Sequence, residues 1–330
     1  MTTLRSGGAR LSEAELPARE TTTGMWPGHY VEVAGARIFV RTTPALAAES
    51  TESAAAEPAL LVHGLGGASI NWTDFAGLLR GHFASESIDL MGHGRSGPAP
   101  DGDYRVSAHA AVVIRYLDQS RRGPVHLVGN SMGGAVSIVV AAKRPDLVRT
   151  LTLISPAVPD NNKLRAHALR GDPRMALLVL PGLGGAALRR VAGETADKRV
   201  KATIALVFGD PSRYPAARLD EAISEAQARE SAAWINTAFL RSLRGLVRMQ
   251  FVKAREMWST MRSIQAPTLI VWGGVDRLVA PALAKDVAAA IPDSRLLVLP
   301  DVGHTAMMED PETTARAVLG LVEDVAARHA

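Results

Sequence analysis

Short apolar runs recur along most of the chain and alternate with longer segments of helical periodicity. Runs of four to eight apolar residues bounded by turn-forming residues predict buried strands. These runs are Ala59–Val62, Ser85–Leu90, Val125–Val128, Val148–Ser155, Pro267–Trp272 and Arg295–Leu299. The segments with helical spacing are Asn71–Arg80, Ser107–Gln119, Pro281–Ala290 and Pro311–Arg328. This alternation predicts an α/β fold with a mostly parallel, doubly wound sheet.

The N-terminal part of the chain adds two further strands. His29–Thr43 contains two β-type runs around Gly35 and predicts a hairpin, which brings the expected sheet to eight strands. Residues 1–24 are polar and without periodicity, so we expect a flexible N-terminal arm. Pro44–Pro58 is rich in Ala, Glu and Ser and is expected to be an exposed loop.

The strand–helix alternation stops between residues 156 and 262. Helix-favouring runs such as Glu221–Phe239 and Leu240–Trp258 replace it, and Pro and Gly residues interrupt them. We therefore expect a helical cap at 156–262, inserted after the sixth strand. The core is expected to consist of residues 25–155 and 263–330.

A serine lies at a predicted strand-to-helix turn in Val125–Ala142. The apolar run meets Gly129, Asn130, Ser131, Met132 and Gly133 and continues as a helix rich in Ala and Val. A residue on so sharp a turn has strained backbone, and its neighbours two positions away must lack a Cβ for the chains to pass. The start of a helix also presents N–H groups that can stabilise an oxyanion. A glycine-rich turn with a serine helix cap is the structural alternative.

Two later loops carry the partners that a nucleophilic serine needs. Asp276 follows the strand Thr268–Trp272, and His304 follows Arg295–Leu299. Loops after the carboxyl ends of parallel strands meet at one sheet edge, so both residues are expected near Ser131. The chain order of serine, aspartate and histidine is the one that accompanies this kind of turn.

Glycines also follow the strand Ala59–Val62, in the run His63, Gly64, Leu65, Gly66 and Gly67. A nucleotide loop requires glycines in a different phase or a Gly-Lys-Ser/Thr sequence, and the chain has neither here. A loop that presents one backbone N–H to an oxyanion fits the spacing better.

Composition excludes several classes of protein. The 330 residues contain no cysteine, so disulfides, thiolate catalysis and cysteine-ligated metals are excluded. No segment has the apolar length of a signal peptide core or a membrane span, so we expect a soluble, cytoplasmic protein. The charge is uneven: residues 156–265 hold 18 Lys and Arg against 10 Asp and Glu, and the remainder holds 19 against 23. Nucleic acid is not an expected partner, because no nucleic-acid-binding motif accompanies this basic region.

Together these motifs make the chain similar to the α/β-hydrolase superfamily, specifically its capped serine hydrolases. The resemblance covers about residues 29–328 and implies that Ser131 is the nucleophile, His304 the general base and Asp276 the orienting carboxylate. It further implies an oxyanion hole formed by the backbone N–H groups of Leu65 and Met132. The expected supporting residues are His63, Gly64, Gly129, Asn130 and Gly133.

Other ionisable residues near these loops have alternative interpretations. Asp160 is the rival to Asp276, because some relatives place the carboxylate after the earlier strand. His63 and His93 are expected to shape loops, and Asp89 and Arg95 to brace the turn after their strand. No cluster of His, Asp and Glu has metal-binding spacing, so neither a metal nor a cofactor is expected.

The resemblance predicts hydrolysis of a carboxylic ester through an acyl-enzyme on Ser131. A serine at this turn, in place of aspartate, argues against the dehalogenase and epoxide-hydrolase branches. Carbon–carbon hydrolysis of ring-cleavage dienoates is the alternative, since Asn130 before the serine resembles that branch, although Thr305 stands where that branch usually has tryptophan. Thioester hydrolysis and a non-catalytic binding role are more remote.

The predicted cap contains an apolar segment, Met175–Val191, and an apolar stripe at helical spacing. The stripe comprises Phe239, Leu243, Leu246, Val247 and Phe251, and Arg241, Arg244, Arg248 and Arg255 fall largely elsewhere on the helix. Packing of a helical lid explains the apolar segment and the apolar stripe. The two apolar features also predict an apolar acyl group in the substrate, and the arginines predict a transient contact of the basic cap with an anionic membrane surface.

Overall fold

The computed structural model describes residues 7–19, 24–46, 56–160 and 193–328. Within them, strands form one nine-stranded sheet in the order β1-β9-β8-β7-β6-β4-β5-β3-β2. The strands are β1 (Gly7–Gly8), β2 (Gly28–Val33), β3 (Ala36–Thr43), β4 (Glu57–Val62), β5 (Phe83–Ile88), β6 (Val125–Asn130), β7 (Val148–Ile154), β8 (Thr268–Gly273) and β9 (Ser294–Leu299). The eight predicted strands are β2 to β9, which are parallel except where β3 pairs with β2 and β5.

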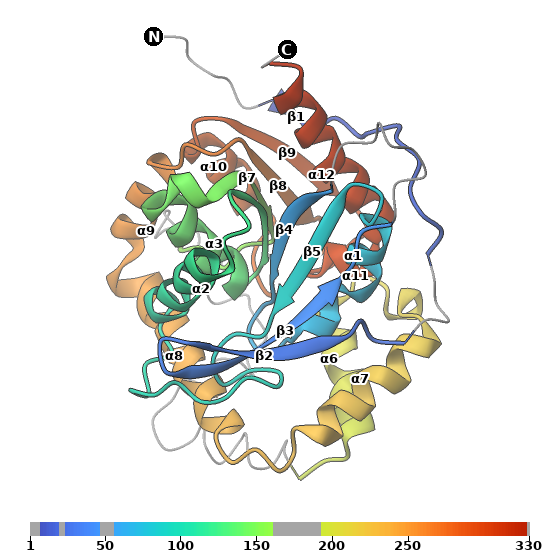
Figure 1. Ribbon diagram of the computed structural model, residues 1–330, viewed down its shortest axis with the longest axis vertical. Coiled ribbons are helices and arrows are strands. Elements are labelled where there is room, and N and C mark those ends of the chain that lie inside the picture. Colours follow the sequence, from blue (N-terminus) through green and yellow to red (C-terminus); the bar gives the residue numbers. More distant parts are fainter. Residues whose placement is uncertain (1–6, 20–23, 47–55, 161–192, 329–330) are drawn as a thin grey trace.

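Helices cover both faces of this sheet. They are α1 (Thr73–Leu78), α2 (Val106–Ser120), α3 (Met132–Lys143), α6 (Ala196–Val207), α7 (Ala216–Ala228), α8 (Ile235–Val252), α9 (Ala254–Arg262), α10 (Leu283–Ala290), α11 (Ala306–Glu309) and α12 (Pro311–Ala326). Figure 1 shows α2, α3, α9 and α10 on one side and α1, α11 and α12 on the other. The prediction of a doubly wound α/β fold is therefore confirmed.

The central strands are apolar on both faces because both faces are covered. In β4, Leu60 and Val62 belong to the core beneath α2 and α3, whereas Ala59 and Leu61 belong to the core beneath α1 and α12. Side chains point alternately to the two faces of a strand, so each face needs its own apolar set. Such a strand appears in the sequence as a continuous apolar run.

Part of the expected N-terminal arm packs on the core. Gly7–Gly8 extend the sheet by pairing parallel with β9, and Ser12 is buried, with its carbonyl accepting a 3.1 Å hydrogen bond from Arg316. Residues 10–12 pass close to α12 where Gly320 has no side chain, because a Cβ there would collide with the Arg10 carbonyl. Residues 7–12 thus lie against the core, and the flexibility of the arm stays a prediction.

The cap lies between β7 and β8, after the sixth of the eight predicted strands. Its helix bounds differ from the predicted runs: α7 ends at Ala228, and α8 and α9 are separated at Lys253. The α9 helix lies against α3 and α10, and its Met257 and Trp258 are part of the core. The boundaries at 155/156 and 262/263 remain predictions, and Met175–Val191 lies outside the described residues.

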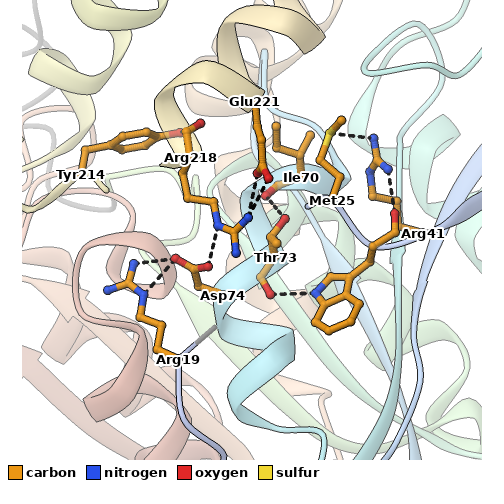
Figure 2. A network of polar contacts seen from close by, with 10 residues as sticks. Arg19, Met25, Arg41, Ile70, Thr73, Asp74, Tyr214, Arg218 and Glu221 are labelled. Atoms are coloured by element: carbon orange, nitrogen blue, oxygen red, sulfur yellow. Dashed lines mark hydrogen bonds and ion pairs between the residues drawn. The ribbon is translucent and has the colours of Figure 1, made fainter. Parts of the chain in front are cut away.

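Helix α7 is tied to the core by two sets of ion pairs. Arg218 bridges Asp74 of the core and Glu221 of its own helix, at 2.7 and 2.8 Å, and Arg19 reaches Asp74 from the N-terminal segment (Figure 2). At the other end of α7, the buried carboxylate of Glu225 pairs with the partly exposed Arg95 at 2.8 Å and with the buried Arg41 of β3 at 3.3 Å. Ion pairs so well buried are costly to break, because the remaining charge has no water to solvate it.

Candidate active site

Ser131 occupies the turn between β6 and α3, and its backbone is strained. Its φ of 53° and ψ of −116° lie outside the regions that ordinary residues prefer, which costs about 1–3 kcal/mol. A Cβ on Gly129 would lie 2.5 Å from the Gly133 carbonyl oxygen and from Ser137 Oγ, and a Cβ on Gly133 would lie 2.5 Å from the His63 carbonyl oxygen. The strained turn between two obligatory glycines is therefore confirmed.

His304 and Asp276 meet at the carboxyl ends of β8 and β9, as predicted. His304 Nδ1 lies 2.8 Å from Asp276 Oδ2, and both side chains are almost completely buried. The other carboxylate oxygen, Oδ1, accepts N–H bonds from Leu278 and Val279 at 2.8 and 3.0 Å. Because Nδ1–H donates to the carboxylate, the neutral ring leaves Nε2 as an acceptor, which is the tautomer a general base requires.

The environment of Asp276 keeps it ionised. Burial raises the pKa of this carboxyl, but His304 and the N–H groups of Val279 and Leu278 outweigh burial, so the net pKa is lowered. Asp276 can therefore stabilise a positive charge on His304 at neutral pH. Asp160, the rival carboxylate, is not the partner of His304 in this structure, because Nδ1 of His304 donates to Asp276.

Asn130 tethers the histidine loop to the sheet. Its buried side-chain amide donates to the carbonyl of Ile154 in β7 at 3.1 Å and to the carbonyl of His304 at 3.0 Å. The residue before the serine thus fixes the distance between the turn and the loop that carries His304. This tether would serve any reaction that uses the two residues, so Asn130 does not discriminate between ester and carbon–carbon hydrolysis.

The loop after β4 lies directly against the serine turn. A Cβ on Gly64 would lie 3.0 Å from Ser131 Cβ and 3.1 Å from Asn130 Oδ1, and Gly66 has a φ of 73°. His63 holds this loop, because its Nδ1 lies 2.7 Å from the Gly64 carbonyl and its Nε2 accepts the Leu90 N–H at 3.0 Å. The loop of Leu65 and the helix start at Met132 are thereby brought to the same end of the sheet.

Asp89 and Arg95 brace the turn after β5, as predicted. Asp89 accepts the N–H of Ser69 at 2.5 Å and the N–H of Arg95 at 2.8 Å. Gly94 has a φ of 53°, and a Cβ there would collide with the Asp89 carboxylate. Burial raises the pKa of Asp89, so its N–H partners are needed to hold the charge.

Three buried histidines lie in a row from the loop of His63 toward the cap, with their rings tilted or edge-to-face. The ring centroids of His63 and His93 are 5.7 Å apart, those of His93 and His109 are 5.8 Å apart, and His109 Nε2 faces Ser242 of α8 at 3.4 Å. Burial lowers the pKa of His63 to about 4 and that of His93 to about 3, and it also lowers the pKa of His109. All three are neutral at pH 7, which agrees with a role in shaping loops.

We expect the protein to lose stability as the pH falls from 6.5 to 5. An unfolded histidine binds a proton below about pH 6.5, whereas folded His63 and His93 stay neutral, so the unfolded state gains protons first. Each of the two contributes up to about 1.4 kcal/mol per pH unit in this window. Urea unfolding at pH 7.5 and pH 5.0 measures the effect.

The His93→Gln variant is the matched control for this pH dependence. Glutamine can still donate to the Met91 carbonyl, which His93 Nδ1 contacts at 2.9 Å, but it does not titrate. Its stability should therefore fall less steeply between the two pH values. Equal slopes in the wild type and the variant would contradict the assignment of the pH dependence to the buried histidines.

Glu309 is a buried residue of the site that the sequence analysis missed. Its carboxylate, at the end of α11, accepts N–H bonds from Gly303, Gly209 and Asp210 at 2.7, 2.9 and 2.8 Å. The sequence signal is a single acidic residue at the end of the apolar run Ala306–Met308, five positions after His304. Its partners are not evident from the sequence, because the cap residues lie about 100 positions away.

Across the described ranges, no group of three or more His, Cys, Asp or Glu side chains could hold a metal ion. In the same ranges, no helix combines the length and the hydropathy that crossing a membrane requires.

Comparisons with known proteins agree with this architecture. A family model described as alpha/beta hydrolase fold matches residues 58–311. Lipase 3 of Moraxella sp. (strain TA144) is 27% identical over 274 residues, which cover 78% of this chain and 75% of the lipase.

Two solved structures share the fold at low sequence identity. A bacterial membrane phospholipase A superposes with a TM-score of 0.69 at 23% identity, covering 91% of this chain and 86% of its own. A meta-cleavage product hydrolase from Pseudomonas fluorescens IP01 superposes with a TM-score of 0.66 at 16% identity, covering 90% and 98%. At these identities the superpositions speak for the fold alone.

Proposed function

The chain belongs to the α/β-hydrolase family, and from this premise we propose that it is a serine hydrolase that cleaves a carboxylic ester through an acyl-enzyme on Ser131. The observation that carries the proposal is the 2.8 Å contact between His304 Nδ1 and Asp276, at the sheet edge that also holds the strained serine turn. A serine hydroxyl is a weak nucleophile unless such an oriented base removes its proton.

The proposed reaction has two halves. Ser131 Oγ attacks the ester carbonyl while His304 Nε2 takes the hydroxyl proton and then delivers it to the leaving alcohol. The N–H groups of Leu65 and Met132 stabilise the oxyanion of each tetrahedral intermediate. A water molecule, deprotonated by His304, then releases the acid and restores the serine.

Lipase relatives support an ester with an apolar acyl group as the substrate class. Carbon–carbon hydrolysis is the second candidate, supported by the shared fold of a meta-cleavage product hydrolase. The tether role of Asn130 weakens the sequence argument for it, because both reactions need His304 held in place. Thioester hydrolysis stays an alternative, and a cytoplasmic location stays a prediction.

A turnover screen tests the proposed function. We expect p-nitrophenyl esters of graded acyl length to be hydrolysed faster than a matched thioester and a ring-cleavage dienoate, and a fluorophosphonate probe to label the protein stoichiometrically. Labelling without ester turnover, together with dienoate cleavage, would favour the second candidate. A protein that neither reacts with the probe nor turns over a substrate would support a non-catalytic role.

The exposed face of α8 supports a transient contact with an anionic membrane. Arg244, Arg248 and Phe251 follow one another at spacings of four and three residues, so they share a face of the helix. Phe251 is 75% exposed and the adjacent Val252 is 64% exposed. Phe251 was predicted to join the buried stripe with Leu243 and Leu246; that prediction is wrong, because its position places it on the arginine face.

Exposed apolar side chains beside cations suit the interface of an anionic bilayer, where the chains insert and the cations meet lipid phosphates. We expect the protein to sediment with vesicles that contain phosphatidylglycerol and not with vesicles of phosphatidylcholine alone. The Phe251→Ser/Val252→Ser variant should lose most of this binding and keep its turnover of a short, water-soluble ester. Equal sedimentation of both proteins would contradict the assignment of the contact to this face.

A further inference from the structure

The C-terminal end of α6 and the residues that follow it touch the two loops that carry Asp276 and His304. We call Val207–Asp210 the cap junction. The backbone N–H of His304 donates to the Val207 carbonyl at 2.6 Å, and Arg277 Nη1 donates to the Ala205 carbonyl at 2.9 Å. A Cβ on Gly209 would lie 2.6 Å from the Asp301 carbonyl oxygen, so the cap junction and the histidine loop are packed without space for a methyl group.

The carboxylate of Glu309 joins the same two segments. One oxygen, Oε2, accepts the N–H of Gly303 at 2.7 Å and the N–H of Gly209 at 2.9 Å, and Oε1 accepts the N–H of Asp210 at 2.8 Å. Arg213 Nη1 lies 3.8 Å from Oε1, and the side chain of Glu309 is completely buried. A buried carboxylate needs several donors, and here the histidine loop and the cap junction supply them together.

Three hydrogen bonds therefore fix the position of His304. Asn130 holds its carbonyl, Val207 holds its N–H, and Asp276 holds the ring at Nδ1. Glu309 fixes the preceding residue, Gly303, and also the cap junction that contains Val207. Movement of the cap junction would displace the backbone of His304 relative to Asn130, which lies in β6, and would disturb the contact of the ring with Asp276.

We propose that Glu309 is a positioning residue that couples the cap junction to the orientation of the His304 ring. The inference rests on the proposed function, since it assigns His304 the role of the base. Glu309 acts through Gly303 and Val207 and does not contact the reacting atoms. The cap thereby sets the geometry of the base as well as covering the site.

The Glu309→Gln variant tests this coupling. Its amide has the size of the carboxylate, but its NH2 group cannot accept the N–H bonds that one oxygen accepts now. A small displacement of a catalytic group has a large effect on rate, so we expect kcat for a short p-nitrophenyl ester to fall roughly 10- to 100-fold with KM within about twofold. The pH profile of kcat/KM should also change, because a displaced ring loses part of its contact with Asp276.

Two further variants separate positioning from stability. Leu321→Ala creates a cavity beneath the C-terminal half of α12 and should lower the melting temperature while keeping kcat and the pH profile. Gly209→Ala should push the cap junction from the histidine loop and reproduce the kcat loss of Glu309→Gln. The double variant Gly209→Ala/Glu309→Gln should then lose little more than either single variant, because both act through one junction.

A measurement that needs no substrate keeps this inference separate from the proposed function. The proton between His304 Nδ1 and Asp276 should give a downfield proton NMR resonance, absent in His304→Ala, that broadens or disappears in Glu309→Gln. A wild-type pH profile and an unchanged resonance in Glu309→Gln, with only a lower melting temperature as in Leu321→Ala, would overturn the coupling. Failure of the wild type to react with esters or the fluorophosphonate probe would overturn the proposed function instead.

Discussion

Replacing Ser131 with alanine is expected to lower kcat for an ester by at least about 10⁴-fold, which corresponds to about 5 kcal/mol of transition-state stabilisation. Without the hydroxyl, no acyl-enzyme forms, and the remaining rate comes from substrate binding and the oxyanion hole alone. The KM should change little, since the methyl group of alanine fills the same turn. Burst kinetics with a p-nitrophenyl ester and labelling with a fluorophosphonate probe measure the loss.

Ser137 provides a matched control for this substitution. It lies on α3, close to the turn, and it is completely buried. Ser137→Ala should keep both turnover and probe labelling, because its hydroxyl does not belong to the proposed reaction. Normal turnover in Ser131→Ala, or loss of labelling in Ser137→Ala alone, would refute the assignment of the nucleophile.

Alanine at position 131 should also report on strain. The wild-type backbone adopts a positive φ at this residue, and alanine tolerates that conformation no better than serine. The variant therefore keeps the strain and should unfold at nearly the wild-type temperature. An activity loss without a stability loss distinguishes removal of a nucleophile from damage to the fold.

The sequence predicts the sheet well because its signals are local. Leu60, Leu61 and Val62 are each buried on one or the other face, so a short apolar run is sufficient evidence of a covered strand. The same holds for the turn at Ser131, since Gly129 and Gly133 are required by atoms of adjacent strands and helices. The positions of Asp276 and His304 follow from the rule that loops after parallel strands share one edge.

The contacts of the cap depend on partners far along the chain, and the sequence does not reveal them. Glu225 pairs with Arg41, 184 positions away, and nothing in the local pattern of either residue distinguishes it from a solvated charge. The burial of α8 also depends on what lies beneath it: Leu246 faces the core, whereas Phe251 is exposed. Hydrophobic periodicity predicts that a helix has an apolar face, but it does not predict which part of the protein that face packs against.

The packing of the N-terminal segment could not be predicted for a similar reason: its partners lie far along the chain. Residues 7–19 lack an apolar pattern, and they are held by backbone pairing with β9, by hydrogen bonds from Arg316 and by an ion pair between Arg19 and Asp74. Backbone hydrogen bonds are available to any residue, so they leave no trace in composition. A polar segment is therefore not evidence of a free arm when a sheet edge lies within its reach.

Exchange of Asp276 for asparagine is expected to lower kcat by about 10⁴-fold, because the substitution selects the wrong histidine tautomer. The N–H groups of Leu278 and Val279 require an acceptor at the position of Oδ1, so the amide oxygen is held there. The NH2 group must then face His304 and donate to Nδ1. The ring proton moves to Nε2, which can no longer accept the proton of Ser131.

The Asp160→Asn variant is the control that separates the two candidate carboxylates. Asp160 follows β7, on the loop where the rival acid would be expected, and His304 Nδ1 is already occupied by Asp276. Asp160→Asn should therefore keep kcat within about threefold of the wild type and leave the pH profile unchanged. A collapse of activity in Asp160→Asn with normal turnover in Asp276→Asn would reassign the carboxylate. Loss of activity in Asp276→Asn with normal turnover in Asp160→Asn would identify Asp276 as the carboxylate that orients the base, with its other oxygen held by the N–H groups of Leu278 and Val279.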